Sequence, residues 1–343
     1  MGIAQNQARV WRERNSATTD MTVGLSKRLH VPATKRPTLH DVARRAEVSA
    51  ATVSRCLTAP EKVSPEVRRR VRTVIDELGY TPHGSARALV SRRSNTIGAV
   101  IPTLDNAIFA TVIQTLQNEL SLKGQTLLLA ASDYSPEREI DQIEKLLVRG
   151  IDGLMLTGEA RDPEVYRMLD RHGTRYVSTY VHHPDSPHAT IGFDNRRAIA
   201  KTVAYLHDLG HRDFAMIAGI GAGNDRASER VAGVREALLE RGIPLDPGRV
   251  VARPYGIAAG RAAFRELLSR SARPTAVICG NDVLAIGALF EALAMGLRVP
   301  ADVSITGFDD LDLAREISPA LTTVHAPLEE MGRLTAAYLL AAD

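Results

Sequence analysis

Small and hydroxyl side chains surround a single arginine in the stretch AATVSR, residues 50–55. If this stretch is helical, Val53 and Leu57 point inward at i, i+4 spacing. Four residues then remain on the outer face: Ala50, Ala51, Ser54 and Arg55. Small residues let a backbone approach the major groove, hydroxyls bond phosphates, and an arginine fork can bond O6 and N7 of one guanine. We therefore predict a DNA-reading helix, with a solvated arginine on a small helical domain as the alternative.

Two short helices separated by a tight turn are predicted to carry this face. Thr38 is a plausible N-cap, with Asp41 three residues later completing a near capping box. The first helix has an apolar face made of Leu39, Val42, Ala43 and Ala46. Glu47 and Val48 turn the chain, and Ser49 caps the second helix. This spacing is typical of a helix-turn-helix.

The charge is divided unequally along the chain. Residues 1–93 contain 18 Lys and Arg against 8 Asp and Glu, whereas the remainder contains 25 against 32. This charge division, a basic head (residues 1–93) on an acidic body (the remainder), indicates that the head binds a polyanion. A membrane surface is the weaker alternative, because no amphipathic helix with a broad apolar face accompanies the charge.

The sequence gives no sign of export or of membrane insertion. It has no apolar run of 18 residues and no secretory h-region. Its two cysteines, Cys56 and Cys279, lack metal-binding spacing. We expect a cytoplasmic chain with two structural thiols.

The body alternates strand-like runs with amphipathic segments of helix length. The strand-like runs are 96–102, 126–131, 153–158, 175–180, 214–219, 275–280 and 303–308, and helices are expected at 137–149, 195–209, 228–241 and 281–295. Such alternation predicts parallel, doubly wound sheets. A body of this size divides into two subdomains with a cleft between them.

Polar and aromatic residues follow several of these strands, where ligands bind in open α/β sheets. A stacking aromatic with Arg, Asn and Asp suits a polar ring such as a sugar. The candidates are Asp105, Ile108, Phe109, Arg230, Tyr255, Asn281 and Asp309.

Two other patterns are weaker. GIGAGN at 219–224 lacks the last glycine of a dinucleotide fingerprint, so a strand-to-helix turn is favoured. His182, His183 and His188 lie in a Pro-rich stretch without acidic or Cys partners, which favours a solvated loop over a metal site. No catalytic motif is present either. We therefore expect no enzyme activity, no catalytic residues, no cofactor and no metal.

Several stretches closely resemble the lac repressor/galactose repressor family. They include TLHDVARRAEVSAATVSR, ELGYTP, NTIGAVIP, RVAGVREAL, PTAVICGNDVLAIGAL and VPADVSITGFDD. The resemblance spans residues 37 to 340. It implies a homodimeric repressor of transcription that binds pseudo-palindromic operators and responds to a small, sugar-like effector in the cleft of a periplasmic-binding-protein-like body.

The resemblance also implies roles for individual residues. Ala50, Ala51, Ser54 and Arg55 would meet base edges, while Arg230, Asn281 and Asp309 would clamp the effector beside Phe109 and Tyr255. His83 stands where the family usually has Asn, and Val67 where a phosphate-contacting Thr is common. The residues that would meet phosphates, orient the reading helix or act in the hinge are Thr38, Ser49, Thr52, Ser64, Tyr80, His83, Arg87 and Leu89. Leu89 would be the wedge that opens a base step in the minor groove.

These observations predict a small all-α helix-turn-helix head followed by an α/β body of two doubly wound subdomains. The predicted parts are a disordered basic extension (1–36, in which Met21 could be the start), the DNA-binding domain (37–82), a hinge (83–95) and the body (96–343). The body's subdomains comprise about 96–195 with 327–343, and 196–326. Family members usually continue past the helix matching 327–340 with a further strand. A periplasmic-type sugar-binding protein without a regulatory role is the alternative function, and the basic head counts against it.

Overall fold

The computed structural model describes residues 37–81, 94–270 and 272–341. These residues belong to two compact units, one on each side of the boundary between Pro82 and His83. The predicted extension 1–36 and the hinge residues His83, Arg87 and Leu89 lie outside the described residues.

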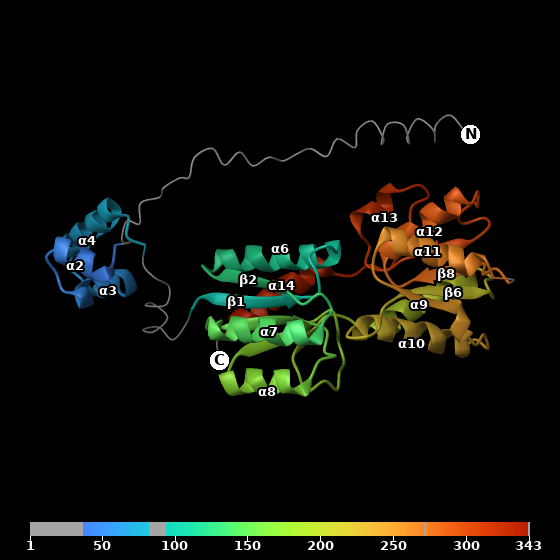
Figure 1. Cartoon of the computed structure of the whole chain (residues 1–343), viewed down its shortest axis with the longest axis horizontal. Helices are drawn as coiled ribbons and strands as arrows, with labels where there is room; N and C mark the ends of the chain where they lie inside the picture. The colour runs from blue at the N-terminus through green and yellow to red at the C-terminus, as the bar shows by residue number, and fades with distance from the viewer. Residues whose placement is uncertain (1–36, 82–93, 271, 342–343) are drawn as a thin grey trace, which may run out of the picture. The chain divides into compact units, whose positions relative to one another are not determined.

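In the described part of the first unit, three helices pack around a small core (Figure 1). They are α2 (Leu39–Arg45), α3 (Ala50–Thr58) and α4 (Pro65–Leu78), with a 3-10 turn at Pro60–Lys62 before α4. Thr38 and Asp41 form the predicted capping box, and Ser49 caps α3 by accepting a hydrogen bond from the N–H of Thr52. Glu47 adopts a positive φ of 52° in the turn between α2 and α3. The predicted helix-turn-helix is confirmed.

Buried valines hold this unit together. Val42, Val53 and Val71 are almost fully buried, so each helix contributes a side chain to one core. Gly79 ends α4 in the left-handed conformation at φ 60°, where a side chain would be strained. Tyr80, directly after it, is buried in the same core.

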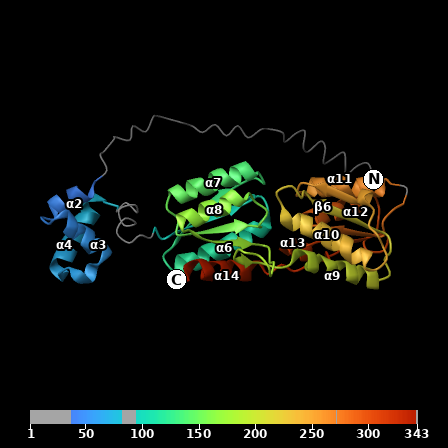
Figure 2. The same cartoon turned by 90° about the horizontal axis from the view of Figure 1, so that it is seen from below.

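The second unit begins with a five-stranded parallel sheet in the order β2-β1-β3-β4-β5. Its strands are β1 (Thr96–Ile101), β2 (Thr126–Ala131), β3 (Gly153–Thr157), β4 (Arg175–Thr179) and β5 (Thr190–Ile191). Helices α6 (Ala107–Leu122) and α14 (Leu328–Leu340) cover one face of the sheet, and α7 (Pro136–Val148) and α8 (Pro163–His172) cover the other (Figure 2). We call this sheet and its helices lobe 1.

A four-stranded parallel sheet in the order β7-β6-β8-β9 forms the centre of lobe 2. Its strands are β6 (Phe214–Gly219), β7 (Val250–Arg253), β8 (Ala276–Cys279) and β9 (Ser304–Thr306). Helices α9 (Asn195–Asp208) and α10 (Asp225–Leu239) pack on one face, and α11 (Ile257–Leu268) and α12 (Asp282–Ala294) pack on the other (Figure 2). The short α13 (Asp312–Glu316) completes lobe 2.

In both sheets the order in which strands are added reverses at the first strand. β1 lies between β2 and β3, and β6 lies between β7 and β8. Chain connections therefore leave in opposite directions from β1 and from β6, which opens a crevice at the carboxyl ends of these strands. The topology predicts where a ligand site should lie in each lobe. No helix in the described residues is both long enough and apolar enough to span a bilayer.

All seven strands predicted from the sequence are present, each within a residue or two of the expected bounds. Two further strands, β5 and β7, were missed. β5 has only two residues, both half-buried, and β7 follows a 3-10 turn at Pro247–Arg249. Short, partly exposed edge strands carry little alternation of apolar and polar residues, which is why pattern reading missed them.

Candidate functional site

The second helix of the head presents the predicted outer face. Ala51 and Arg55 are exposed, while Thr52 and Ser54 are half-buried. Ala50 is also half-buried and packs against the head core. The face has no bulky side chain besides Arg55. The α3 backbone can therefore come close to the major groove of DNA while Arg55 reaches into it.

A residue with a hydroxyl side chain occupies the N-cap of each of α2, α3 and α4 in the head. The side chains of Thr38, Ser49 and Ser64 each accept a hydrogen bond from a backbone N–H in the first turn of the helix that follows. Backbone N–H groups at helix N-termini favour anions, and these side chains lie beside them. Tyr80 differs, since only 6% of it is exposed, so its ring supports the core that orients α3.

Residues from both lobes line a cleft at the carboxyl ends of the strands. Its outer part has a volume of about 470 Å³, which falls in the range of small-molecule pockets. Its inner part is narrow, about 10 Å³, because side chains from the two lobes meet there. The described structure brings all seven predicted residues to this cleft: Asp105 in the outer part, Tyr255 in both, and Ile108, Phe109, Arg230, Asn281 and Asp309 in the inner part.

Two buried polar atoms in the inner cleft have no hydrogen-bond partner among the described residues. They are Nδ2 of Asn281 and Oδ2 of Asp309. Asn281 caps α12 through its Oδ1, which accepts a hydrogen bond from the N–H of Leu284, so its amide group has a fixed orientation. An unpaired buried donor and an unpaired buried acceptor are each costly in a folded protein. Together they could bind a ligand that both accepts and donates hydrogen bonds.

The carboxyl group of Asp309 has an unusual electrostatic environment. Asp309 is 2% exposed and has a positive φ of 117°. Burial raises the pKa of Asp309 to about 7, although the nearby Arg230 guanidinium opposes this shift. The carboxyl therefore changes protonation near neutral pH and can accept or donate a hydrogen bond.

Arg230 reaches the cleft from α10 and is held on several sides. Its Nε donates to Oδ1 of Asn195 at 2.9 Å, and its Nη1 donates to the carbonyl of Gly280 at 2.6 Å. Its Nη2 lies 3.7 Å from Oδ1 of Asp309. Asn195 is the first residue of α9, where the chain enters lobe 2. Arg230 therefore links the start of α9 to the residues that follow β8 and β9.

An edge-to-face contact between Phe109 and Tyr180 forms the apolar wall of lobe 1. Their ring centroids are 5.4 Å apart, with an interplanar angle of 76°. The hydroxyl of Tyr180 donates to the carbonyl of Ile108 at 2.9 Å, which fixes the start of α6. The inner cleft is therefore lined by aromatic carbon on the lobe 1 side and by polar groups on the lobe 2 side.

Four further residues line the inner cleft and were not predicted: Tyr134, Tyr180, Asn224 and Arg226. Tyr180 is the last residue of the strand-like run 175–180, and Tyr134 lies three residues after the run 126–131. The rule that selected the other candidates therefore applies to both tyrosines. In the sequence, Asn224 stands out only as the residue that breaks a glycine motif. It caps α10 and donates to the hydroxyl of Tyr255 at 3.3 Å.

The two weaker patterns have structural roles. Residues 220–224 form the turn between β6 and α10, as predicted. His182 and His183 are exposed, but the prediction of a solvated loop was wrong for His188, which is half-buried. Its ring stacks on Tyr166 with the centroids 3.6 Å apart and bonds the hydroxyl of Tyr176. No group of three or more potential metal ligands occurs within the described part of the chain.

Each of the two units matches a model of a known protein family. A family model described as "Bacterial regulatory proteins, lacI family" matches residues 38–83, and one described as "Periplasmic binding protein-like domain" matches residues 203–342. The HTH-type transcriptional regulator GntR of Escherichia coli (strain K12) is 34% identical over 308 residues, which cover 90% of this chain and 92% of GntR.

Two solved structures extend the similarity to three dimensions. The lac repressor dimer bound to operator and the anti-inducer ONPF has a TM-score of 0.78 at 26% identity, covering 89% of this chain and 92% of that one. The complex of the transcriptional regulator CelR with cellobiose has a TM-score of 0.64 at 33% identity, with the same coverage.

The match of the head argues against a periplasmic-type binding protein without a regulatory role, and the relatives are regulators rather than enzymes. The chain therefore belongs to the lacI family of DNA-binding transcription regulators, with a helix-turn-helix head and a periplasmic-binding-protein-like body.

Proposed function

We propose that this chain acts in the cytoplasm as a homodimeric repressor. In this proposal it binds a pseudo-palindromic operator, and a sugar or sugar derivative in the cleft controls that binding. The lac repressor structure, a dimer on its operator, supports the DNA side of the proposal. The CelR–cellobiose complex supports the sugar side. The observation that carries the effector site is that the unpaired Nδ2 of Asn281 and the unpaired Oδ2 of Asp309 belong to residues lining the same inner cleft.

On the DNA side, Arg55 would read a guanine, with Ala50, Ala51 and Ser54 against the neighbouring base edges. Thr38, Ser49, Thr52 and Ser64 would bond phosphates, and Tyr80 would orient α3 from within the core. The resemblance assigns His83, Arg87 and Leu89 to a hinge in residues 83–95 that enters the minor groove. Residues 37–82 would form the DNA-binding domain and 96–343 the effector-binding body.

On the effector side, Asn281 would donate to a ligand oxygen and Asp309 would accept from a ligand hydroxyl. Arg230 would add charge-assisted donors, and Phe109 and Tyr255 would pack on the faces of the sugar ring. Ile108 and Asp105 would line the apolar floor and the polar mouth. This combination of fork-like polar groups and aromatic faces is typical of sugar sites.

Isothermal titration of the full chain with D-glucose, D-gluconate and cellobiose tests the effector site. Binding by the wild type that is lost in Asp309→Asn would support the site. Asp208→Asn serves as the control, since Asp208 is 81% exposed on α9 and lies outside the cleft lining. Equal affinity of Asp309→Asn and the wild type for the same sugar would place the effector elsewhere.

A further inference from the structure

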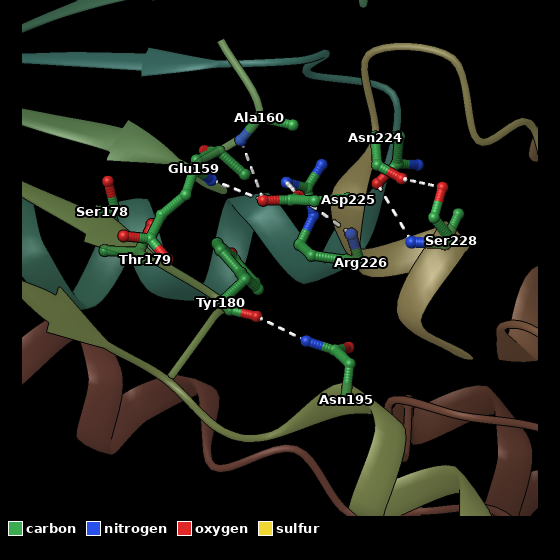
Figure 3. A network of polar contacts seen from close by, with 12 residues as sticks. Glu159, Ala160, Ser178, Thr179, Tyr180, Asn195, Asn224, Asp225, Arg226 and Ser228 are labelled. Carbon is green, nitrogen blue, oxygen red and sulfur yellow. Dashed lines mark hydrogen bonds and ion pairs between the residues drawn. The ribbon is translucent and has the colours of Figure 1, made fainter. Parts of the chain in front are cut away.

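A second contact between the lobes lies beside the cleft, where the loop at residues 158–161 meets the first turn of α10. The carboxylate of Asp225 in lobe 2 accepts hydrogen bonds from two backbone N–H groups of lobe 1 (Figure 3). Oδ2 of Asp225 lies 2.5 Å from the nitrogen of Glu159 and 3.1 Å from that of Ala160. Hydrogen bonds to an ionised acceptor are stronger than neutral ones, so this is a charge-assisted contact across the lobe boundary.

The backbone of lobe 1 is shaped for this close approach. Gly158 has a φ of 75°, a conformation that favours glycine. A Cβ at this position would overlap the Arg226 guanidinium and the Asp225 carboxylate. The turn conformation therefore favours glycine, and a side chain here would displace the Asp225 and Arg226 side chains of the opposite lobe.

The loop is held in place by its own lobe. The side chain of Arg161 is 1% exposed and donates to the carbonyl of Thr157 at 3.2 Å and to the hydroxyl of Tyr166 at 3.0 Å. The hydroxyl of Tyr166 in turn donates to the carbonyl of Glu159 at 3.1 Å. The two N–H groups that meet Asp225 thus lie on a fixed part of lobe 1.

Asp225 also contacts the cleft. Its Oδ1 accepts from Nη1 and from the backbone N–H of Arg226, each at 2.9 Å. Arg226 is 6% exposed and lines the inner cleft together with Tyr180 and Asp309. Burial alone would raise the pKa of Asp225, but Arg226 and the backbone donors hold it below the ordinary value, so the carboxylate is charged at neutral pH. One carboxylate therefore joins the lobe 1 loop to an arginine of the cleft.

We propose that Asp225 is a positioning residue that couples lobe closure to effector binding. When lobe 2 closes on residues 158–161, Asp225 is fixed by Glu159 and Ala160 and holds the Arg226 guanidinium in the inner cleft. When the lobes separate, the carboxylate loses both donors and Arg226 loses its fixed orientation. This proposal rests on the proposed effector site, and it adds a regulatory contact that does not itself touch the effector.

The test uses the full chain and the substitution Asp225→Asn, which removes the charge and replaces one acceptor oxygen with a donor. Asp162→Asn is the matched control, because the side chain of Asp162 also accepts a hydrogen bond at a helix N-terminus, from the N–H of Glu164 in its own lobe. Hydrogen exchange of the Glu159 and Ala160 amides should quicken in Asp225→Asn and stay unchanged in the control. If Asp225→Asn does not fold, Asp225→Ser, whose side chain is too short to reach lobe 1, replaces it.

A double-mutant cycle separates positioning from a purely structural effect. Titrations with D-glucose, D-gluconate and cellobiose are compared for the wild type, Asp225→Asn, Arg226→Gln and the double variant. We expect Asp225→Asn to weaken binding about 10-fold, the usual size for a lost charge-assisted hydrogen bond. The double variant should bind no more weakly than Arg226→Gln alone, because Asp225 acts through Arg226.

Additive losses in the cycle, or unchanged amide exchange in Asp225→Asn, would overturn the proposal. If none of the three sugars binds the wild type, the sugar class of the proposed function fails, and amide exchange alone decides. Faster exchange at Glu159 and Ala160 in Asp225→Asn would then support the contact between Asp225 and lobe 1, and unchanged exchange would exclude it.

Discussion

The guanidinium of Arg230 stacks on the ring of Phe308, with its central carbon 3.7 Å from the ring centroid. Phe308 is fully buried, so this cation–π contact is shielded from water. The stack fixes the plane of the guanidinium, and the acceptors on Asn195 and Gly280 fix its rotation within that plane. The arginine therefore presents a rigid donor to the cleft.

Replacing Arg230 with Lys should weaken both the body and the effector site. An ammonium group cannot stack on Phe308 or bond two acceptors in one plane, so the free energy of unfolding should fall by about 1–3 kcal/mol. Urea unfolding of the full chain, followed by the change in circular dichroism, measures this loss. Arg235→Lys is the control, because Arg235 is exposed on the same helix. A change in the control as large as that in Arg230→Lys would contradict the role of the stack.

Effector affinity should depend on pH through Asp309. Its pKa lies near 7 in the free protein, and ligand hydroxyls that donate to Oδ2 stabilise the ionised form. Binding should therefore release protons, and affinity for a sugar should rise about 10-fold between pH 6 and pH 8. Calorimetric titration in buffers of different ionisation enthalpy gives both the affinity and the number of protons released.

The same titration on Asp309→Asn is the control for this pH dependence. The variant cannot titrate, so any remaining affinity should be flat between pH 6 and pH 8. An affinity of the wild type that falls as pH rises would mean that the protonated carboxyl binds the sugar, contrary to this account.

Arg55 should determine base specificity. It is the long, forked donor exposed on the outer face of α3, and a bidentate pair with guanine contributes about 1–3 kcal/mol of discrimination. Arg55→Ala should therefore lower affinity for the operator about 10- to 100-fold while leaving binding to random DNA nearly intact. Gel-shift titrations of both DNAs, with Arg69→Ala on α4 as the control, measure the ratio. Equal losses on operator and random DNA would show that Arg55 contacts only phosphates.

The stability of the head should depend on the cap of α3. Ser49 accepts from the N–H of Thr52 at 3.1 Å, so Ser49→Ala should cost the head about 1 kcal/mol, whereas Ser49→Gly should cost only a few tenths. Amide exchange of residues 50–58 measures the difference. If both variants exchange at the wild-type rate, the cap does not stabilise α3.

Much of the fold could be predicted because periodicity and turn chemistry agree. The apolar residues of α2 and α3 recur at helical spacing next to clear capping residues, and each buried strand of the body is a short apolar run ended by polar residues. The seven candidate residues of the cleft could be selected because parallel strands all end at one edge of a sheet.

The sequence could not reveal how the two lobes approach each other. Asp225 and Glu159 are 66 residues apart, and the contact uses backbone N–H groups that every residue but proline possesses. The stack between Arg230 and Phe308 likewise joins residues far apart in the sequence. Such contacts depend on the packing of two sheets, which local patterns do not encode.

The central claim is that the cleft controls DNA binding, and one measurement tests it most directly. Fluorescence anisotropy gives the Kd of the full chain for its operator with and without a saturating sugar that binds the cleft. We expect that sugar to change the operator Kd of the wild type by at least about 5-fold, the lower end of typical allosteric coupling, and to leave the Kd of Asp309→Asn unchanged. The same operator Kd for the wild type with and without the bound sugar would contradict the account.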